Sequence, residues 1–150
     1  MRPRAESVDA LVIGAGQAGL AVSYYLTAFG VEHLVLERGE VAESWRSARW
    51  DSFTLVTPNW MTRLPGHQLA PGTAARFDPR DGVISTLERF AAGLPVHINT
   101  EVRSLVAAEG GYRVSTPDQD YAARTVVVAG GGQRLPTIPE LAAFVARQTA

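Results

Sequence analysis

Three closely spaced glycines follow the first apolar segment of the chain, and their spacing is typical of a turn that binds a phosphate-bearing ligand. Gly14, Gly16 and Gly19 form the pattern Gly-x-Gly-x-x-Gly between a predicted strand and a predicted helix. In such a turn the first glycine permits the bend, the second lets the backbone approach a pyrophosphate, and the third lets the helix pack closely on the sheet. The pyrophosphate meets free N–H groups at the positive end of the helix dipole. The spacing therefore predicts a dinucleotide-binding turn.

An acidic residue farther along the chain supports this interpretation. Glu37 ends the second predicted strand, at about the 20-residue interval where dinucleotide-binding domains place the acid that binds a ribose diol. The glycine pattern by itself is a weak signal. Here the strand, the helix and the acid agree, so we expect Glu37 to accept hydrogen bonds from a ribose.

Composition limits the classes of function. The chain has 150 residues, 46% of them hydrophobic, a formal net charge of −1 and no cysteine. The length is that of one domain, and the apolar fraction is that of an ordinary globular protein. No run of like charges suggests a nucleic-acid or membrane partner. Without cysteine there is no disulfide or thiolate metal site, and no pattern resembles a metal cluster, a Ser-His-Asp triad or paired catalytic carboxylates.

The amino-terminal segment superficially resembles a secretory signal, with basic residues before the apolar stretch of residues 10–22. The patterned glycines interrupt that stretch, and no run of about 18 apolar residues follows anywhere in the chain. We therefore expect no membrane-spanning helix and a cytoplasmic location.

Hydrophobic periodicity predicts the order strand, helix, strand for the first part of the chain. Val8–Ile13 is a nearly continuous apolar run, as expected for a parallel strand buried on both faces. Gln17–Phe29 has apolar residues at helical spacing, and Gly30 is placed to cap that helix. His33–Glu37 is predicted as the second strand of a right-handed βαβ unit. His33 stands just before that strand, where it can hydrogen-bond locally, and no catalytic role is expected for it.

Residues 38–82 have little periodicity and are predicted as a long loop with one short helix at Glu40–Ser47. All three tryptophans, Trp45, Trp50 and Trp60, fall in this loop. Long irregular segments are usually functional or disordered, and disordered segments are poor in aromatic residues. We therefore favour an ordered loop that faces a ligand. The alternative is a satellite hydrophobic cluster beneath the loop.

The aromatic and arginine side chains of this loop suit a flat π system, through stacking and cation–π contacts. For Arg46 and Arg49 the alternative is solvated surface charge.

The second half of the chain predicts a helix, a short strand and a β-meander. The predicted segments are a helix at Asp81–Gly93, a parallel strand at Pro95–Asn99, meander strands at Glu101–Ala107, Gly111–Ser115 and Tyr121–Thr125, a buried strand at Val126–Ala129, and a short helix from about Glu140. The fold class is therefore α/β, a Rossmann-like FAD/NAD(P)-binding domain with a parallel sheet, helices and a β-meander crossover.

The segment Ser44–Trp60 reads SWRSARWDSFTLVTPNW. Together with the glycine turn, it resembles the FAD domain of flavin-containing and Baeyer–Villiger type monooxygenases, and most closely a bacterial subgroup that shares this motif. The resemblance covers nearly the whole chain. It implies that FAD is the cofactor and that the activity is NADPH-dependent flavin monooxygenation.

The resemblance also implies a set of cofactor-binding residues. Residues of the glycine turn and of the last strand would hold the pyrophosphate, the acid after the second strand would bind the adenosine ribose, and the Trp/Arg loop would pass the ribityl chain and the flavin ring. The implied residues are Gly14, Gly16, Gln17, Gly19, Glu37, Arg38 on the adenine side, Ser44, Trp45, Arg46, Asp51, Leu55, Thr57, Val102 through its backbone to adenine, Ala129 and Gly130, with Asn59 as a catalytic candidate.

The chain departs from the family pattern at two places. Ala42 and Glu43 stand where many relatives have two glycines, and Gly130 stands where relatives usually have threonine. Close backbone approach at the first place and a hydroxyl contact at the second are therefore in question.

The resemblance implies that residues 1–135 form the FAD-binding part and that residues 136–150 form a linker toward an NADPH domain that this sequence does not contain. We therefore expect a truncated or split form, with a partner chain as a possible source of the NADPH half. The substrate is not readable from the sequence, nor is activity of the chain alone. Two alternatives stay open: an NAD(P)-binding dehydrogenase module, and a non-catalytic remnant that only binds a nucleotide.

Overall fold

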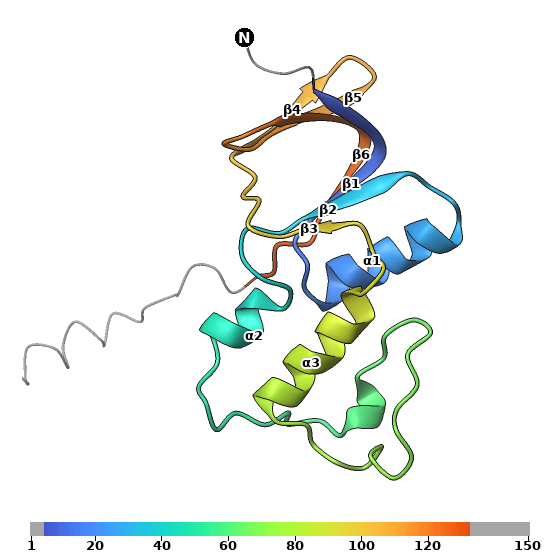
Figure 1. The fold of residues 1–150 in the computed structure, drawn as a ribbon, viewed down its shortest axis with the longest axis vertical. Coiled ribbons are helices and arrows are strands. Elements are labelled where there is room, and N and C mark those ends of the chain that lie inside the picture. Colours follow the sequence, from blue (N-terminus) through green and yellow to red (C-terminus); the bar gives the residue numbers. More distant parts are fainter. Residues whose placement is uncertain (1–4, 133–150) are drawn as a thin grey trace, which may run out of the picture.

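The computed structural model describes residues 5–132, so the predicted linker and the helix from about Glu140 lie outside the described residues. Figure 1 shows the strands at one end of the molecule, α1 and α3 next to them, and a long loop at the other end. The elements are β1 (Glu6–Ile13), α1 (Gln17–Ala28), β2 (His33–Leu36), α2 (Glu43–Ser47), the 3-10 helix η1 (Asn59–Met61), α3 (Arg80–Ala91), β3 (Val96–His97), β4 (Ser104–Ala108), β5 (Gly111–Ser115) and β6 (Asp120–Val128).

The strands form one six-stranded sheet in the order β3-β2-β1-β6-β5-β4. The neighbours β3, β2, β1 and β6 run parallel, whereas β4, β5 and β6 form an antiparallel meander. The predicted α/β class, with a parallel sheet, helices and a β-meander, is confirmed.

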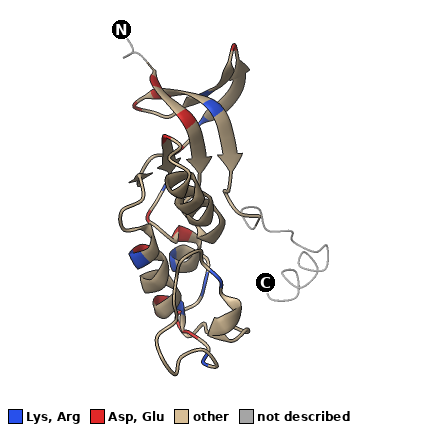
Figure 2. Cartoon of the chain, turned by 90° about the vertical axis from the view of Figure 1, so that its right-hand side faces the viewer, with Lys and Arg blue, Asp and Glu red and all other residues tan. Residues whose placement is uncertain are grey.

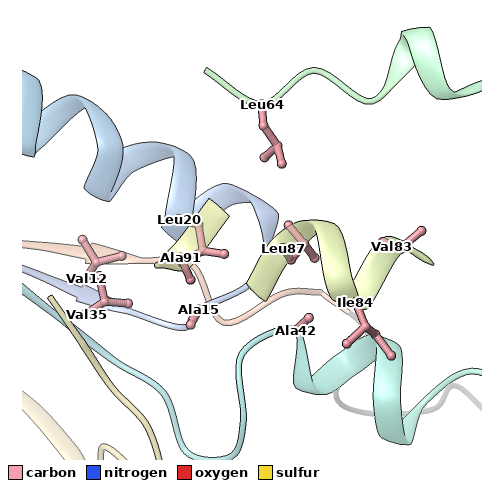
Figure 3. Close-up of a cluster of buried hydrophobic side chains, with 10 residues drawn as sticks. All are labelled: Val12, Ala15, Leu20, Val35, Ala42, Leu64, Val83, Ile84, Leu87 and Ala91. Atoms are coloured by element: carbon pink, nitrogen blue, oxygen red, sulfur yellow. The ribbon is translucent and has the colours of Figure 1, made fainter. Parts of the chain in front are cut away.

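Two apolar clusters hold the sheet in place. The larger one joins Val12 and Val35 of the parallel strands to Leu20 of α1 and Leu87 of α3 (Figure 3). The second cluster joins Leu11 of β1 and Leu34 of β2 to Val114 of the meander strand β5. Successive residues of β1 therefore belong to different clusters, because side chains alternate between the two faces of a strand. This burial on both faces explains the continuous apolar run in the sequence of β1.

The last strand differs from its prediction. The segments Tyr121–Thr125 and Val126–Ala129 were expected as two separate strands, but Asp120–Val128 is one strand. Tyr121 pairs with residues of both β1 and β5, so β6 belongs to the parallel and the antiparallel part at once. The sequence pattern changes within this strand because β5 covers only its first half, and the backbone continues without a break.

Several element boundaries also shift slightly. Phe29 caps α1, and Gly30 follows with a φ of +69°, the left-handed conformation that glycine adopts readily. The short helix after β2 covers only Glu43–Ser47. The first meander strand begins at Ser104, because the segment before it turns to the end of β2, where Thr100 N donates to Glu37 O at 2.7 Å.

The long loop after β2 is ordered by its own hydrogen bonds. Thr54 and Pro79 form an isolated β-bridge across it. The buried amide of Asn59 donates to Thr73 O (3.1 Å) and Asp78 Oδ1 (2.7 Å), and its Oδ1 accepts a bond from Asp78 N at 2.9 Å. These bonds join the two arms of the loop, so the predicted order of this segment has a physical basis.

Charge is distributed over the whole described surface. Figure 2 shows basic and acidic residues interspersed along the strands, helices and loop. Among residues 5–132, no helix is long and apolar enough to cross a membrane.

A buried histidine connects α1 to β2. His33 Nδ1 lies 2.9 Å from Val31 O, and its Nε2 lies 2.7 Å from Ser23 Oγ. A carbonyl only accepts hydrogen bonds, so Nδ1 carries a proton, and in this tautomer of the neutral ring Nε2 accepts a bond from the serine hydroxyl. The predicted local role of His33 is confirmed, and Ser23 is the partner that the sequence pattern did not identify.

Removing the Ser23 hydroxyl tests whether its hydrogen bond to His33 stabilises the fold. Ser23→Ala leaves His33 Nε2 buried without its donor, so we expect the free energy of unfolding to fall by about 1–3 kcal/mol. Urea unfolding followed by circular dichroism measures the change, with Ser104→Ala on the exposed strand β4 as control. Equal stability of the two variants would contradict the role of Ser23.

Candidate dinucleotide-binding site

The glycine turn lies where the carboxyl ends of three parallel strands meet. Gly14 N donates to Leu36 O of β2, and Ala129 N donates to Ile13 O of β1, each at 2.8 Å. In open α/β sheets, ligands bind at the carboxyl ends of the strands, at the point where the connections diverge. The structure therefore brings together the predicted residues that follow β1, β2 and β6.

The three glycines of the turn have different surroundings. A Cβ on Gly14, whose φ is +107°, would lie 2.6 Å from Ala129 O. A Cβ on Gly19 would overlap the carbonyl oxygen of Gly14. A Cβ on Gly16 would have no atom within 4 Å. Gly14 and Gly19 are thus required by the protein's own packing, whereas Gly16 borders open space that a ligand can occupy.

The start of α1 presents unpaired backbone donors to this space. Gly16 is the N-cap, with extended backbone and no side-chain capping bond, and the first turn of the helix contains no acidic residue. The first N–H groups of a helix have no intrahelical acceptor, and they carry the positive end of the helix dipole. Gln17 begins the helix and is exposed. This combination suits an anionic group.

Glu37 ties the turn to the end of β2. Its side chain is buried, with Oε2 accepting a bond from Ala15 N at 2.8 Å and Oε1 accepting one from Gly39 N at 3.0 Å. Each carboxylate oxygen has further acceptor capacity, so these bonds leave room for a hydroxyl donor. The neighbouring Arg38 is exposed. Glu37 therefore has a structural role that the sequence pattern did not predict.

The segment before α2 lies against the glycine turn with an unusual backbone. Ala42 is fully buried and has φ +63° and ψ +28°, the left-handed region that favours glycine. Its N–H donates to Ala15 O at 3.2 Å, which connects the two loops. Many relatives were expected to have glycine here, and the conformation explains that preference. The alanine retains the turn, and its methyl group packs in the larger apolar cluster.

Helix α2 carries three of the predicted residues. Ser44 is exposed, and Trp45 is half-buried with its ring edge-to-face with Phe53. Arg46 donates from Nε to Val41 O at 3.1 Å and from Nη2 to Glu88. Arg46 is thus partly exposed, but both of these hydrogen bonds are to groups of the protein.

The tryptophans behave differently from one another. Trp45 and Trp50 both contact Phe53, and Arg49 stacks over Trp45 and Phe53. Trp45 also packs against the larger apolar cluster, whereas Trp50 is exposed. Trp60 in η1 is half-exposed.

The other predicted residues of the loop, which follow α2, differ in their exposure and contacts. Asp51 is almost fully exposed and pairs with Arg80 at 2.6 Å. The hydrogen bonds that the Arg80 guanidinium donates to Asp81 and Asp51 raise the pKa of Arg80 above its ordinary value. Leu55 and Thr57 are half-buried. The amide of Asn59 is engaged within the loop, and its catalytic role stays a prediction.

The remaining predicted residues flank the turn or the second cluster. Ala129 and Gly130 are half-buried beside Gly14. Val102 packs against the second apolar cluster. The nearby Asn99 N donates to Gly39 O at 2.9 Å, so the segment that contains Val102 lies at the end of β2.

Two cavities adjoin the loop. A small one of about 30 Å³ is lined by Gln17, Leu55 and Asn59, so the structure brings these three predicted residues together. A larger hollow of about 880 Å³ lies between α1, α3 and residues 65–70, and the stacked rings of Tyr24 and Phe90 form part of its wall. The sequence pattern did not identify this hollow, which is not lined by the glycine turn. Among the described residues, no group of three or more His, Asp or Glu side chains could hold a metal ion.

The sequence profile of one protein family covers most of the chain. The pyridine nucleotide-disulphide oxidoreductase family matches residues 11–144. The chain belongs to this family.

Individual relatives of the chain agree with that assignment. A Geobacillus kaustophilus protein named "uncharacterized oxidoreductase CzcO-like" is 40% identical over 138 residues, which are 90% of this chain and 39% of that protein. The "probable indole-3-pyruvate monooxygenase YUCCA1" of Arabidopsis thaliana is 31% identical over 137 residues, which are 87% of this chain and 33% of that protein. The chain spans about two fifths or less of the length of these relatives.

A solved structure shows the same fold. The flavin-containing monooxygenase from Stenotrophomonas maltophilia superposes with a TM-score of 0.80 at 28% identity, covering 90% of this chain and 42% of that chain. The predicted resemblance to flavin-containing monooxygenases is therefore confirmed.

The contrast between two glycines of the turn is testable. Gly19→Ala forces a methyl group against the carbonyl of Gly14, so we expect the free energy of unfolding to fall by about 3 kcal/mol or more. Gly16→Ala changes it by less than about 1 kcal/mol, because its methyl group meets open space and only the capping preference is lost. Urea unfolding of both variants measures this contrast, and similar losses would contradict it.

The structural role of Glu37 predicts an effect without any ligand. In Glu37→Gln the amide NH₂ group must face one of the two backbone N–H groups, so stability falls by about 1–3 kcal/mol. The exposed Glu32→Gln is the matched control, with a change within about 0.5 kcal/mol. Unchanged thermal and urea unfolding of Glu37→Gln would show that these bonds contribute nothing to the fold.

Proposed function

We propose that this chain is the FAD-binding part of an NAD(P)H-dependent flavin monooxygenase or a related oxidoreductase. The observation that carries the proposal is the open space at Gly16, next to the uncapped start of α1. The other two glycines of the turn are closed off by backbone atoms. A pyrophosphate fits this cradle, because a Cβ would fill the space and the helix start supplies N–H donors.

The residues around the cradle suit the other parts of FAD. Glu37 is held in place by two backbone N–H groups and keeps acceptor capacity for the adenosine ribose. The backbone of residues 42–44 borders the turn through the bond from Ala42 to Ala15. Leu55 and Thr57 are assigned to the flavin side of the site, and Val102 and Arg38 to the adenine side. When bound, the flavin supplies the redox chemistry, while this chain binds and orients it.

The proposal assigns residues 1–135 to the FAD-binding domain and residues 136–150 to a linker. The NADPH-binding part would come from another domain or from a partner chain. We assign the protein to the cytoplasm and leave its small-molecule substrate open.

Binding of FAD to the purified chain tests the proposal. We expect the wild type to quench flavin fluorescence on titration. Gly16→Val should weaken FAD binding by about 100-fold or more, because the side chain displaces the pyrophosphate from the N–H groups. Its circular dichroism spectrum should match that of the wild type, since the substitution meets open space in the protein. Ala107→Val, on the exposed strand β4, adds the same side chain away from the turn.

Each result separates the alternatives. Retained FAD affinity in Gly16→Val would reject this turn as the site. Binding of NAD⁺ in preference to FAD would favour a dehydrogenase module, and a folded wild type that binds neither would favour a non-catalytic remnant.

A further inference from the structure

Helix α2 stands beside the glycine turn, and its apolar residue, Trp45, packs against the larger apolar cluster. It has five residues, Glu43–Ser47, and none of them is buried. A helix this short is not stable by itself, so its contacts must hold it in place. The turn that leads into it contains Ala42 in a left-handed conformation, which costs free energy for a residue other than glycine. The position of this segment therefore depends on side-chain contacts.

Arg46 joins α2 to α3, a helix that lies far from it in the sequence. Its Nε donates to Val41 O at 3.1 Å, directly before the left-handed residue, and its Nη2 pairs with Glu88 Oε1 on α3. Helix α3 is anchored in the core through Ile84 and Leu87. One guanidinium thus joins the turn beside the glycine loop to a helix that is fixed in the core.

We propose that Arg46 and Glu88 are positioning residues for FAD, an inference that rests on the proposed function. The pair holds the backbone of residues 41–44 against the glycine turn, where that backbone borders the pyrophosphate cradle. Arg46 acts through Val41 and Glu88, and its charge is not directed at the cofactor phosphates. Glu88 lies on α3, in a part of the chain to which neither the glycine motif nor the family resemblance gave a role.

Removal of Glu88 distinguishes positioning from direct contact by the sign of its effect. Where Arg46 binds the phosphates directly, Glu88→Gln frees the guanidinium for the anion and FAD binds more tightly. Where Arg46 positions the loop, Glu88→Gln weakens binding by about two- to fivefold, the range of a half-exposed ion pair. Glu88→Gln removes a negative charge, which by itself makes the binding of anionic FAD tighter. A weaker FAD affinity in this variant is therefore explained by lost positioning and not by the change in net charge.

The experiment is a flavin titration of the full chain at low and high salt. Asp9→Asn removes another acidic partner, that of Arg124 at 3.5 Å, and is the matched control for net charge. We expect Glu88→Gln alone to weaken binding, with a smaller difference at high salt because salt screens the pair. Urea unfolding of the FAD-free variants identifies the conditions in which every variant is fully folded, so a general loss of stability does not enter the measured affinity.

A charge exchange completes the test. Arg46→Glu places two acids together and should weaken FAD binding by about tenfold or more. The double variant Arg46→Glu/Glu88→Arg should recover part of that loss, because it restores the ion pair, whereas a carboxylate at position 46 cannot donate to Val41 O. Unchanged or tighter binding by Glu88→Gln, or no recovery in the double variant, overturns the inference while the proposed function stands. A wild type that does not bind FAD rejects the proposed function, and the inference with it.

Discussion

The start of α1 approaches the end of β1 so closely that no side chain fits at Gly19, and the rest of the site depends on this approach. The carbonyl of Gly14 occupies the space that a methyl group would need, and Gly14 itself lies against Ala129 at the end of β6. Because the turn is confined on these sides, its one unfilled position, at Gly16, faces outward. The open position at which we propose an anion thus results from packing as much as from the chemistry of the turn.

Buried polar groups add a second layer to this arrangement. Glu37 accepts two backbone N–H bonds from the loops after β1 and β2, which keeps a carboxylate buried without leaving it unsatisfied. The same side chain keeps acceptor capacity for the ribose that the proposed function assigns to it, so under that proposal one residue both stabilises the fold and recognises the ligand. At Ala42 a cost and a gain are combined. The left-handed backbone costs free energy, and burial of the methyl group in the larger apolar cluster offsets part of that cost.

The parts of the structure that the sequence predicted are those in which the pattern is local. Strand β1 and helix α1 have continuous or helical apolar spacing, and the glycine turn between them has fixed conformational requirements. The division of β6 into two strands was wrong, because its apolar pattern changes where β5 ends although the backbone continues.

The sequence could not predict which side chains pair with each other, for a related reason. Arg46 and Glu88 are 42 positions apart, and Asn59 and Asp78 are 19 apart, so neither pair leaves a periodic trace in the sequence. The loop motif indicated that Arg46 matters, but it could not show whether the guanidinium faces a ligand or another helix. Only the fold, by placing α3 beside α2, supplies the partner.

The continuity of β6 limits how this domain can be rebuilt. One end of the strand pairs with β5 in the meander, and the other end delivers Ala129 to the glycine turn. The meander is therefore not a removable insertion between two halves of a nucleotide-binding fold. Shortening the hairpin of β4 and β5 would remove one of the two strands that pair with the first half of β6, and would leave β1 as its one neighbour there.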